Sequence, residues 1–429
     1  MEKLVDKLLD FIDDSPCSYY TIENAKKLLK ENSFVENNLS EDLKLEAGAK
    51  GFVINNDSAI IAYRIADKID ENTFFKIVGS HSDSPGFRIK TNPVMKNENI
   101  IKLNTEVYGG PIIYTWFDKP LSLAGRVSTK SENPLKPQVN LLNIDKDLLI
   151  IPSLAIHMNR EVNKGFEFNP QIHTLPIMML DNNEKIDSDA LLKLIAEELN
   201  VNPSDIIDYD LYLYDRQKGS KLGVNNEFIS VGRQDNLTMA FTSLKALVDT
   251  KPKSGINITI ITDNEEVGSR TIQGADSPFI VNTLERISLA LGFNREKFLQ
   301  MQEKSFMLSA DLAHAVHPNF TEKADPTNRP KMGEGIVIKY AANKSYTSDG
   351  YSAAVVKSLC ENKKIKYQEF FNRSDKSGGS TIGPITSSHL NVRACDVGSP
   401  ILSMHSVREL GSAEDVENAY GLFSAMYER

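Results

Sequence analysis

Residues 256–269, INITIITDNEEVGS, place an apolar β-rich run directly before two adjacent glutamates, Glu265 and Glu266. In α/β sheets, ligand-binding groups lie at the carboxyl ends of the strands, so we expect a functional site here. Adjacent carboxylates at a partly enclosed strand end repel each other and lose hydration. Cations would reverse that cost, because one glutamate could bind metal while the other takes a proton from water. A solvated charge pair is the alternative interpretation.

The rest of the chain repeats this alternation of short apolar strands with helical patterns. The further expected strands are GFVI, SAIIAYRI and FFKIVGS between residues 51 and 80, FMLSAD (306–311), GIVIK (335–339) and LNVRACDV (390–397). The expected helices cover residues 236–248, 277–291, 349–360 and 413–427. This alternation predicts an α/β fold with a mixed, largely parallel sheet that is covered by helices on both faces.

The middle of the chain, residues 94–230, differs in composition and in its secondary-structure pattern. It is richer in proline and asparagine, with short β-like runs and one clear helical pattern at 187–199. A chain of 429 residues also exceeds the ~250–300 residues that one core usually holds. We therefore predict a catalytic domain formed by residues 1–93 and 231–429, and an inserted β-rich domain that serves as an oligomerisation surface or a lid.

The composition excludes several classes of protein. A net charge of −9 argues against a nucleic-acid or anionic-membrane binder, which would need a basic face. The three cysteines lie far apart and lack the spacing of a thiolate zinc site, so we expect free thiols in a reducing compartment. No apolar run approaches the ~20 residues of a membrane span, and the N-terminal segment carries acidic residues throughout. These features predict a cytoplasmic protein.

Other candidate metal ligands stand at the ends of the expected strands. His81 follows FFKIVGS, and Asp83 can bind the second ring nitrogen of His81, although such a pair is also common without a metal. Asp311 and His405 end two further strands, and Asp235 opens a helix, where it could instead be a helix cap. Two histidines and three carboxylate ligands suit a pair of zinc ions better than magnesium, which would not need imidazoles.

At this point the sequence resembles the aspartyl aminopeptidase family of co-catalytic dizinc metallopeptidases. The blocks that carry the resemblance keep their order along the chain. They are SHSDSPGFRIK (80–90), TWFDKPLSLAGRV (115–127), IPSLAIHMNREVNKGFEFNPQ (151–171), RQDN (233–236), DNEEVGSRTIQGA (263–275), SADLAHAVHPNF (309–320), STIGP (380–384) and SMHSVRE (403–409). The resemblance implies removal of single N-terminal residues, chiefly Asp or Glu, from peptides. It also implies two zinc ions per subunit, with cobalt or manganese as substitutes, and a homo-oligomer built from dimers, up to a dodecamer.

The resemblance also implies a role for each matching residue. His81 and Asp311 would be the outer ligands of one zinc, Glu266 and His405 those of the other, and Asp235 would bridge them. Glu265 would be the general base, and Asp83 the carboxylate behind His81. The implied substrate contacts are His314, Lys339, Tyr346 and, from a neighbouring subunit, His157.

The chain departs from the family pattern at Gln234, at residues 108–114 and at residues 372–379. None of these positions is a predicted metal ligand, but the last two could reshape the substrate pocket. The alternatives are therefore the same chemistry with broad or neutral specificity, a deacylase, or an inactive zinc-containing scaffold. The free carboxylate of Glu265 beside Glu266 argues against the scaffold, because structural zinc needs only ligands.

Overall fold

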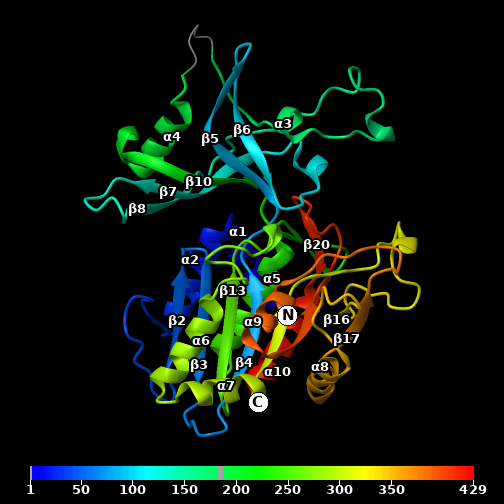
Figure 1. The fold of residues 1–429 in the computed structure, drawn as a ribbon. Helices are drawn as coiled ribbons and strands as arrows, with labels where there is room; N and C mark the ends of the chain where they lie inside the picture. The colour runs from blue at the N-terminus through cyan, green and yellow to red at the C-terminus, as the bar shows by residue number, and fades with distance from the viewer. Residues whose placement is uncertain (1, 182–186) are drawn as a thin grey trace. The chain divides into compact units, whose positions relative to one another are not determined.

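The computed structural model describes residues 2–181 and 187–429, and the chain forms two compact units (Figure 1). The first unit comprises Met1–Asp83, Gly219–Met404 and Glu409–Arg429, and the second comprises Ser84–Lys218 and His405–Arg408. The predicted boundaries, after residues 93 and 230, lie further along the chain than these. Strand β5 (Gly86–Asn97) already pairs within the second unit, and β11 (Ser220–Leu222) already pairs within the first, which explains both differences.

The first unit is built on a nine-stranded sheet with the order β1-β2-β3-β13-β4-β14-β18-β16-β17. Its strands are β1 (Val35–Glu36), β2 (Lys50–Asn55), β3 (Ala59–Ile65), β4 (Phe75–His81), β13 (Ile256–Thr262), β14 (Phe306–Ala310), β16 (Ile336–Tyr340), β17 (Tyr367–Phe371) and β18 (Arg393–Gly398). The four central strands, β13, β4, β14 and β18, run parallel, whereas β3 and β16 pair with this group in the antiparallel sense. The predicted mixed, largely parallel sheet is therefore confirmed.

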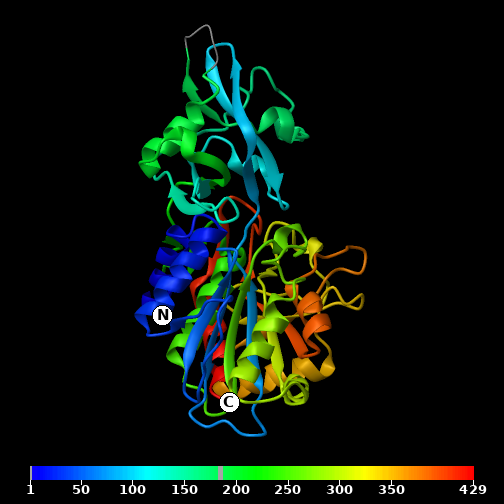
Figure 2. The same ribbon diagram turned by 60° about the vertical axis from the view of Figure 1, so that its left-hand side comes forward.

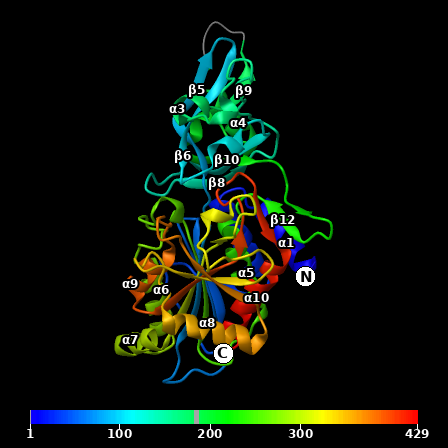
Figure 3. The ribbon, with the colours of Figure 1, turned by 90° about the vertical axis from the view of Figure 1, so that its right-hand side faces the viewer.

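Helices cover both faces of this sheet, as Figure 3 shows with the sheet viewed nearly along its edge. One face packs against α1 (Glu2–Asp13), α2 (Ser18–Glu31), α5 (Gln234–Asp249), α8 (Gly350–Lys363) and α10 (Ala413–Tyr427). Figure 2 shows the two N-terminal helices, in blue, on this side. The other face packs against α6 (Phe279–Ala290), α7 (Arg295–Lys304) and α9 (Ile382–Leu390). Every residue of β4 and β13 is buried, as expected for parallel strands covered on both sides.

The register of the central strands determines which residues meet at the carboxyl edge of the sheet. Thr262, the last residue of β13, aligns with His81, the last residue of β4. Strand β14 aligns Ser309 with Gly79 and ends one residue before Asp311. Segments that are far apart in sequence therefore end side by side at one edge.

Smaller elements complete the first unit. Strands β11, β12 (Phe228–Val231) and β20 (Glu409–Ser412) form a three-stranded sheet, and β15 (Ala313–His314) pairs with β19 (Pro400–Ile401). Among the residues that the structure describes, 2–181 and 187–429, no helix is both long and apolar enough to cross a membrane.

The second unit is β-rich, as predicted, and contains a six-stranded antiparallel sheet with the order β8-β7-β10-β5-β6-β9. Its remaining strands are β6 (Ile100–Tyr108), β7 (Leu121–Thr129), β8 (Gln138–Asn143), β9 (Ile177–Leu180) and β10 (Ile206–Asp215), accompanied by the helices α3 (Pro170–His173) and α4 (Ala190–Leu199). The helix predicted at 187–199 is thus α4, which begins at Ala190. Buried apolar side chains of β5, β7, β10 and α4 form the core of this unit.

Candidate metal centre

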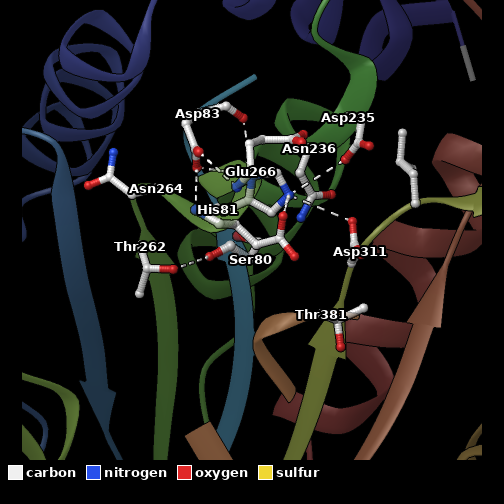
Figure 4. A network of polar contacts seen from close by, with 12 residues as sticks. Ser80, His81, Asp83, Asp235, Asn236, Thr262, Asn264, Glu266, Asp311 and Thr381 are labelled. Atoms are coloured by element: carbon white, nitrogen blue, oxygen red, sulfur yellow. Dashed lines mark hydrogen bonds and ion pairs between the residues drawn. The ribbon is translucent and has the colours of Figure 1, made fainter. Parts of the chain in front are cut away.

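His81 ends β4 and is held from one side by Asp83. Its Nδ1 lies 3.1 Å from the backbone carbonyl oxygen of Asp83 and 3.3 Å from Oδ1 of the Asp83 carboxylate. His81 is 1% exposed. This contact places Nδ1 against Asp83 and directs Nε2 toward the opposite side, as Figure 4 shows. An outer carboxylate or carbonyl of this kind sets the tautomer and orientation of a metal-binding histidine.

Three carboxylates face the Nε2 atom of His81. Oδ1 of Asp235 lies 3.6 Å from it, Oδ1 of Asp311 lies 3.7 Å from it, and Oε2 of Glu265 lies 4.0 Å from it. His81, Asp235 and Glu266 also offer ligand atoms that all lie within 4.8 Å of one another. Ligand bonds to zinc of ~2.0–2.2 Å leave neighbouring ligand atoms roughly 3–4 Å apart, so this spacing fits the metal.

Asp83 also holds the two glutamates. Its Oδ1 accepts the backbone N–H of Glu265, and its Oδ2 accepts that of Glu266, each at 3.1 Å. One carboxylate therefore positions both the imidazole and the turn that follows β13. The sequence predicted Asp83 behind His81 but not this second contact.

Asn264 fixes the conformation of the same turn. Its backbone is left-handed, with a φ of 62°, a conformation that asparagine tolerates better than most residues. Its side-chain oxygen accepts hydrogen bonds from the hydroxyl of Thr271 at 2.8 Å and from the amide of Gln273 at 2.9 Å. The loop that returns from the turn thus fixes the direction in which Glu265 and Glu266 leave the sheet.

Burial and mutual repulsion perturb the acids of this centre. Burial, followed by the charges of Asp311 and its neighbours, raises the pKa of Glu265 to about 8, although His81 opposes the shift. Burial and then the charge of Asp83 raise the pKa of Asp263, at the end of β13, to about 7. Burial alone would lower the pKa of His81, but hydrogen bonds to the surrounding carboxylates raise it well above its usual value. The centre holds an excess of negative charge that a cation would relieve.

The predicted substrate contacts of the first unit lie on neighbouring elements. His314, in β15, is exposed, and its ring centroid lies 6.2 Å from that of Phe370. Lys339, in β16, is buried and donates to Oδ2 of Asp311 at 3.2 Å. Tyr346 is buried, with its ring 5.2 Å from the Lys339 Nζ.

The structure groups five of the predicted residues around His81 and assigns two others to the second unit. The group consists of Asp83, Asp235, Glu265, Glu266 and Asp311, all in the first unit. His405 belongs to the second unit, where its Nδ1 lies 3.1 Å from the carbonyl oxygen of Gly110. His157 also belongs to the second unit and is exposed.

The sequence analysis gave no role to Glu409, which supports Asp235. Glu409 is 2% exposed, and its Oε2 accepts the backbone N–H of Asp235 at 3.0 Å. The amide of Gln234 donates to the carbonyl oxygen of Glu409 at 2.9 Å, so this departure from the family pattern takes part in the same contact. The signal was available, because Glu409 is the last residue of the block SMHSVRE.

An imidazole and several carboxylates at the carboxyl edge of a mostly parallel α/β sheet are the fold and the donor set of a metal-dependent hydrolase. Comparison of the chain with known protein families identifies its family. A family model described as "Aminopeptidase I zinc metalloprotease (M18)" matches residues 11–427. The chain belongs to this family of zinc metalloproteases and is an aminopeptidase, a hydrolase of peptide bonds.

Individual relatives are similar over nearly their whole length. "Probable M18 family aminopeptidase 2" of Clostridium novyi is 50% identical, with 99% of this chain and 98% of the relative covered. "Aspartyl aminopeptidase 4" of Saccharomyces cerevisiae is 39% identical, with 99% and 94% covered. A cryo-EM structure of the Ape4 and Nbr1 complex contains a chain that is 35% identical, with a TM-score of 0.95 and with 99% of this chain and 85% of that chain covered.

Proposed function

We propose that this aminopeptidase uses two zinc ions and removes N-terminal Asp or Glu from peptides. The observation that carries the proposal is the convergence of Asp235, Asp311 and Glu265 on the Nε2 atom of His81. His81 and Asp311 would hold one ion, Glu266 would hold the other, and Asp235 would bridge them. The family resemblance supplies His405 as the remaining ligand.

An excess of buried negative charge supports the binding of divalent cations. The cluster includes the carboxylates of Asp83, Asp235, Glu265, Glu266 and Asp311, and the ammonium of Lys339 contacts one of them. With His81 neutral, as a ligand must be, negative charge is left in excess. Divalent cations would offset this excess in a buried site.

Glu265 is the proposed general base. Zinc bound at this centre would supply Lewis-acid polarisation of the scissile carbonyl group and a lower pKa for the attacking water. Glu265 would take the proton from that water and deliver it to the leaving amine. Its backbone N–H donates to Asp83, which holds the turn that carries Glu265 and Glu266. His314, the exposed residue of β15, would stabilise the oxyanion.

We propose further that the chain forms a homo-oligomer through its second unit. Residues 152–158 are exposed along their whole length, and Leu154, Ile156 and Met158 are 55%, 47% and 70% exposed. The start of this segment is tied to the unit, because the backbone N–H of Ser153 donates to Asp118 Oδ1 at 2.8 Å. Exposed apolar side chains that flank a candidate site residue such as His157 are typical of a protein interface. This arrangement supports the predicted contribution of His157 to a neighbouring subunit's site.

The preference for acidic residues is supported by the name of the yeast relative, "Aspartyl aminopeptidase 4". A pocket for an acidic side chain must offset the desolvation of a carboxylate, which requires a cation or several donors. The sequence proposed Lys339, with Tyr346 as a second donor. Lys339 is buried, and its Nζ donates to Oδ2 of Asp311 at 3.2 Å and lies 5.2 Å from the ring centroid of Tyr346, so both candidates lie beside the proposed metal centre.

One experiment tests the chemistry and the specificity separately. Purified protein is stripped with a chelator and assayed on aspartyl, glutamyl, leucyl and alanyl chromogenic amides after addition of zinc, cobalt or manganese. We expect no activity without metal, recovery with metal, and faster hydrolysis of the acidic amides. N-acetylated aspartyl amide is the matched control, because an aminopeptidase needs the free amine and a deacylase does not. Full activity in a verified metal-free sample contradicts the proposal, whereas a preference for leucyl or alanyl amides contradicts only the acidic specificity.

A further inference from the structure

Asp396, in β18, is a fully buried carboxylate that lies outside the proposed ligand set. Its Oδ2 accepts both the backbone N–H and the hydroxyl of Thr347, each at 2.6 Å. Its Oδ1 accepts the hydroxyl of Thr381, the residue before α9. Its own backbone N–H donates to the hydroxyl of Ser348 at 2.9 Å. One buried residue therefore joins the segment that contains Thr347 and Ser348 to the start of α9.

The same two segments also contact each other and pack closely. The hydroxyl of Ser380 donates to the carbonyl oxygen of Ser345 at 3.2 Å. A Cβ atom at Gly383, in the first turn of α9, would lie 2.9 Å from each carboxylate oxygen of Asp396 and 2.8 Å from Oγ of Ser309. This close approach requires glycine. The block STIGP (380–384), to which the sequence analysis gave no role, thus packs directly against Asp396.

The segment that Asp396 anchors carries Tyr346. Tyr346 is 5% exposed, and its ring centroid lies 5.2 Å from Nζ of Lys339 and 6.5 Å from the ring centroid of Phe370. Thr347 follows Tyr346 directly in the chain. The two hydrogen bonds from Thr347 to Asp396 therefore hold the backbone that carries the tyrosine ring.

We propose that Asp396 is a positioning residue for substrate recognition, which holds Tyr346 beside Lys339 through its bonds to Thr347 and Thr381. This inference rests on the proposed function, because Tyr346 matters for recognition only if the pocket beside Lys339 binds the side chain of the N-terminal residue. A purely structural role for Asp396 would lower stability without acting through Tyr346. The two roles can be separated, because asparagine keeps one acceptor oxygen and replaces the other by an NH2 group.

A double-mutant cycle of Asp396→Asn with Tyr346→Phe tests the inference. Asp396→Asn alone should lower kcat/KM for the aspartyl amide about 10- to 100-fold, the scale of a lost hydrogen bond to a charged group, and less for the alanyl amide. In the Tyr346→Phe background the same change should have a much smaller effect, because the hydroxyl that it positions is already absent. Zinc content should equal that of wild type in all variants. Additive losses, equal losses for both amides, or loss of zinc from Asp396→Asn would overturn the inference.

Two further variants keep the test decisive if Asp396→Asn does not fold. Thr347→Val removes the hydroxyl donor but keeps the backbone N–H, so it should shift the ratio of aspartyl to alanyl hydrolysis in the same direction by a smaller factor. Asp415→Asn is the matched control, because Asp415 is also fully buried and accepts two backbone N–H groups, and this ratio should stay unchanged. An unchanged ratio in Thr347→Val, or an equal shift in Asp415→Asn, would overturn the inference.

The wild-type protein separates this inference from the proposed function. A wild-type preference for neutral amides would contradict the proposed acidic specificity. The cycle of Asp396→Asn with Tyr346→Phe, repeated on the amide that wild type hydrolyses fastest, would still show whether Asp396 acts through Tyr346.

Discussion

Asp415 and the acids around His81 are both buried in the first unit, but their surroundings are built differently. Asp415, near the start of α10, is fully buried and accepts the backbone N–H groups of Gly333 at 2.6 Å and of Gly335 at 2.8 Å. Burial raises its pKa to about 7, although these two donors oppose the shift. The start of a helix also favours a negative charge. This carboxylate is stabilised by the backbone of the protein itself.

The centre around His81 groups its carboxylates around one imidazole instead. Asp83 resembles Asp415, because it also accepts two backbone N–H groups. Asp235, Asp311 and Glu265, by contrast, converge on a single ring nitrogen. The difference separates an acid that protein donors satisfy from acids that would need a cation. Asp415 is surrounded by donors, whereas the carboxylates around His81 face one another across the space that a cation would fill.

The largest expected effect is at Glu266. Glu266→Gln should reduce zinc affinity by more than the ~10–100-fold typical of residues that only orient a ligand, and activity should be lost with the metal. Metal analysis after dialysis measures the first effect, and hydrolysis of an aspartyl amide measures the second. Asp415→Asn is the control from the other centre and should keep its zinc. Normal zinc content in Glu266→Gln would remove this residue from the ligand set.

Mixing two inactive variants tests whether the second unit completes a neighbour's site. His157→Ala chains and Glu265→Gln chains should each be inactive alone. If subunits exchange and share sites, an equal mixture should recover about a quarter of wild-type activity, because that share of sites receives intact residues from both chains. Unmixed variants at the same concentration provide the baseline. A strictly monomeric, fully active wild-type protein in sedimentation would contradict the shared site.

The pH dependence of thermal stability should differ between the metal-free and the zinc-bound protein. The pKa of Glu265 is raised from 4.5 to about 8 and that of His81 is raised above 6.5, so the folded metal-free protein binds more protons than the unfolded chain. Its melting temperature should therefore fall as the pH rises from about 5 to 8. Zinc requires deprotonated ligands, so the stabilisation by zinc should grow over the same range. If the melting temperature changed equally with pH in the presence and absence of zinc, this account of the charges would be contradicted.

The smallest expected effect is at Asp415. Asp415→Asn retains one side-chain oxygen, so one of the N–H groups of Gly333 and Gly335 would face an NH2 group instead of an acceptor. We expect a loss of about 1–3 kcal/mol in the free energy of unfolding at pH 8, measured with urea. Zinc affinity and kcat/KM should stay at the wild-type values. A loss of zinc would mean that the two centres are coupled.

The sequence was informative where local pattern determines structure. Apolar runs before His81, Glu265 and Asp311 predicted strands, and the rule that strand ends carry ligands predicted a common edge. The contacts of Asp83 with the backbone of Glu265 and Glu266 depend on the register between β4 and β13, which no local pattern encodes.

The contact of Lys339 with Asp311 could not be predicted for the same reason. Lys339 is four residues into a typical strand pattern, and only the packing of β16 near the end of β14 brings it to Asp311. The assignment of His405–Arg408 to the second unit could not be predicted either, because a segment of four residues has no sequence pattern that marks a domain boundary. Long-range pairing determines these features.

The most direct test of the mechanism is whether Glu265 and Glu266 have the separate roles of base and ligand. Zinc content and turnover of an aspartyl amide should be measured on the same preparation of Glu265→Gln, alongside wild type. If Glu265 is the base and not a ligand, the variant should keep about two zinc ions per chain and lose at least the ~10²–10⁴-fold that general base catalysis contributes. Loss of both ions, or turnover at the wild-type rate with zinc bound, would contradict the mechanism.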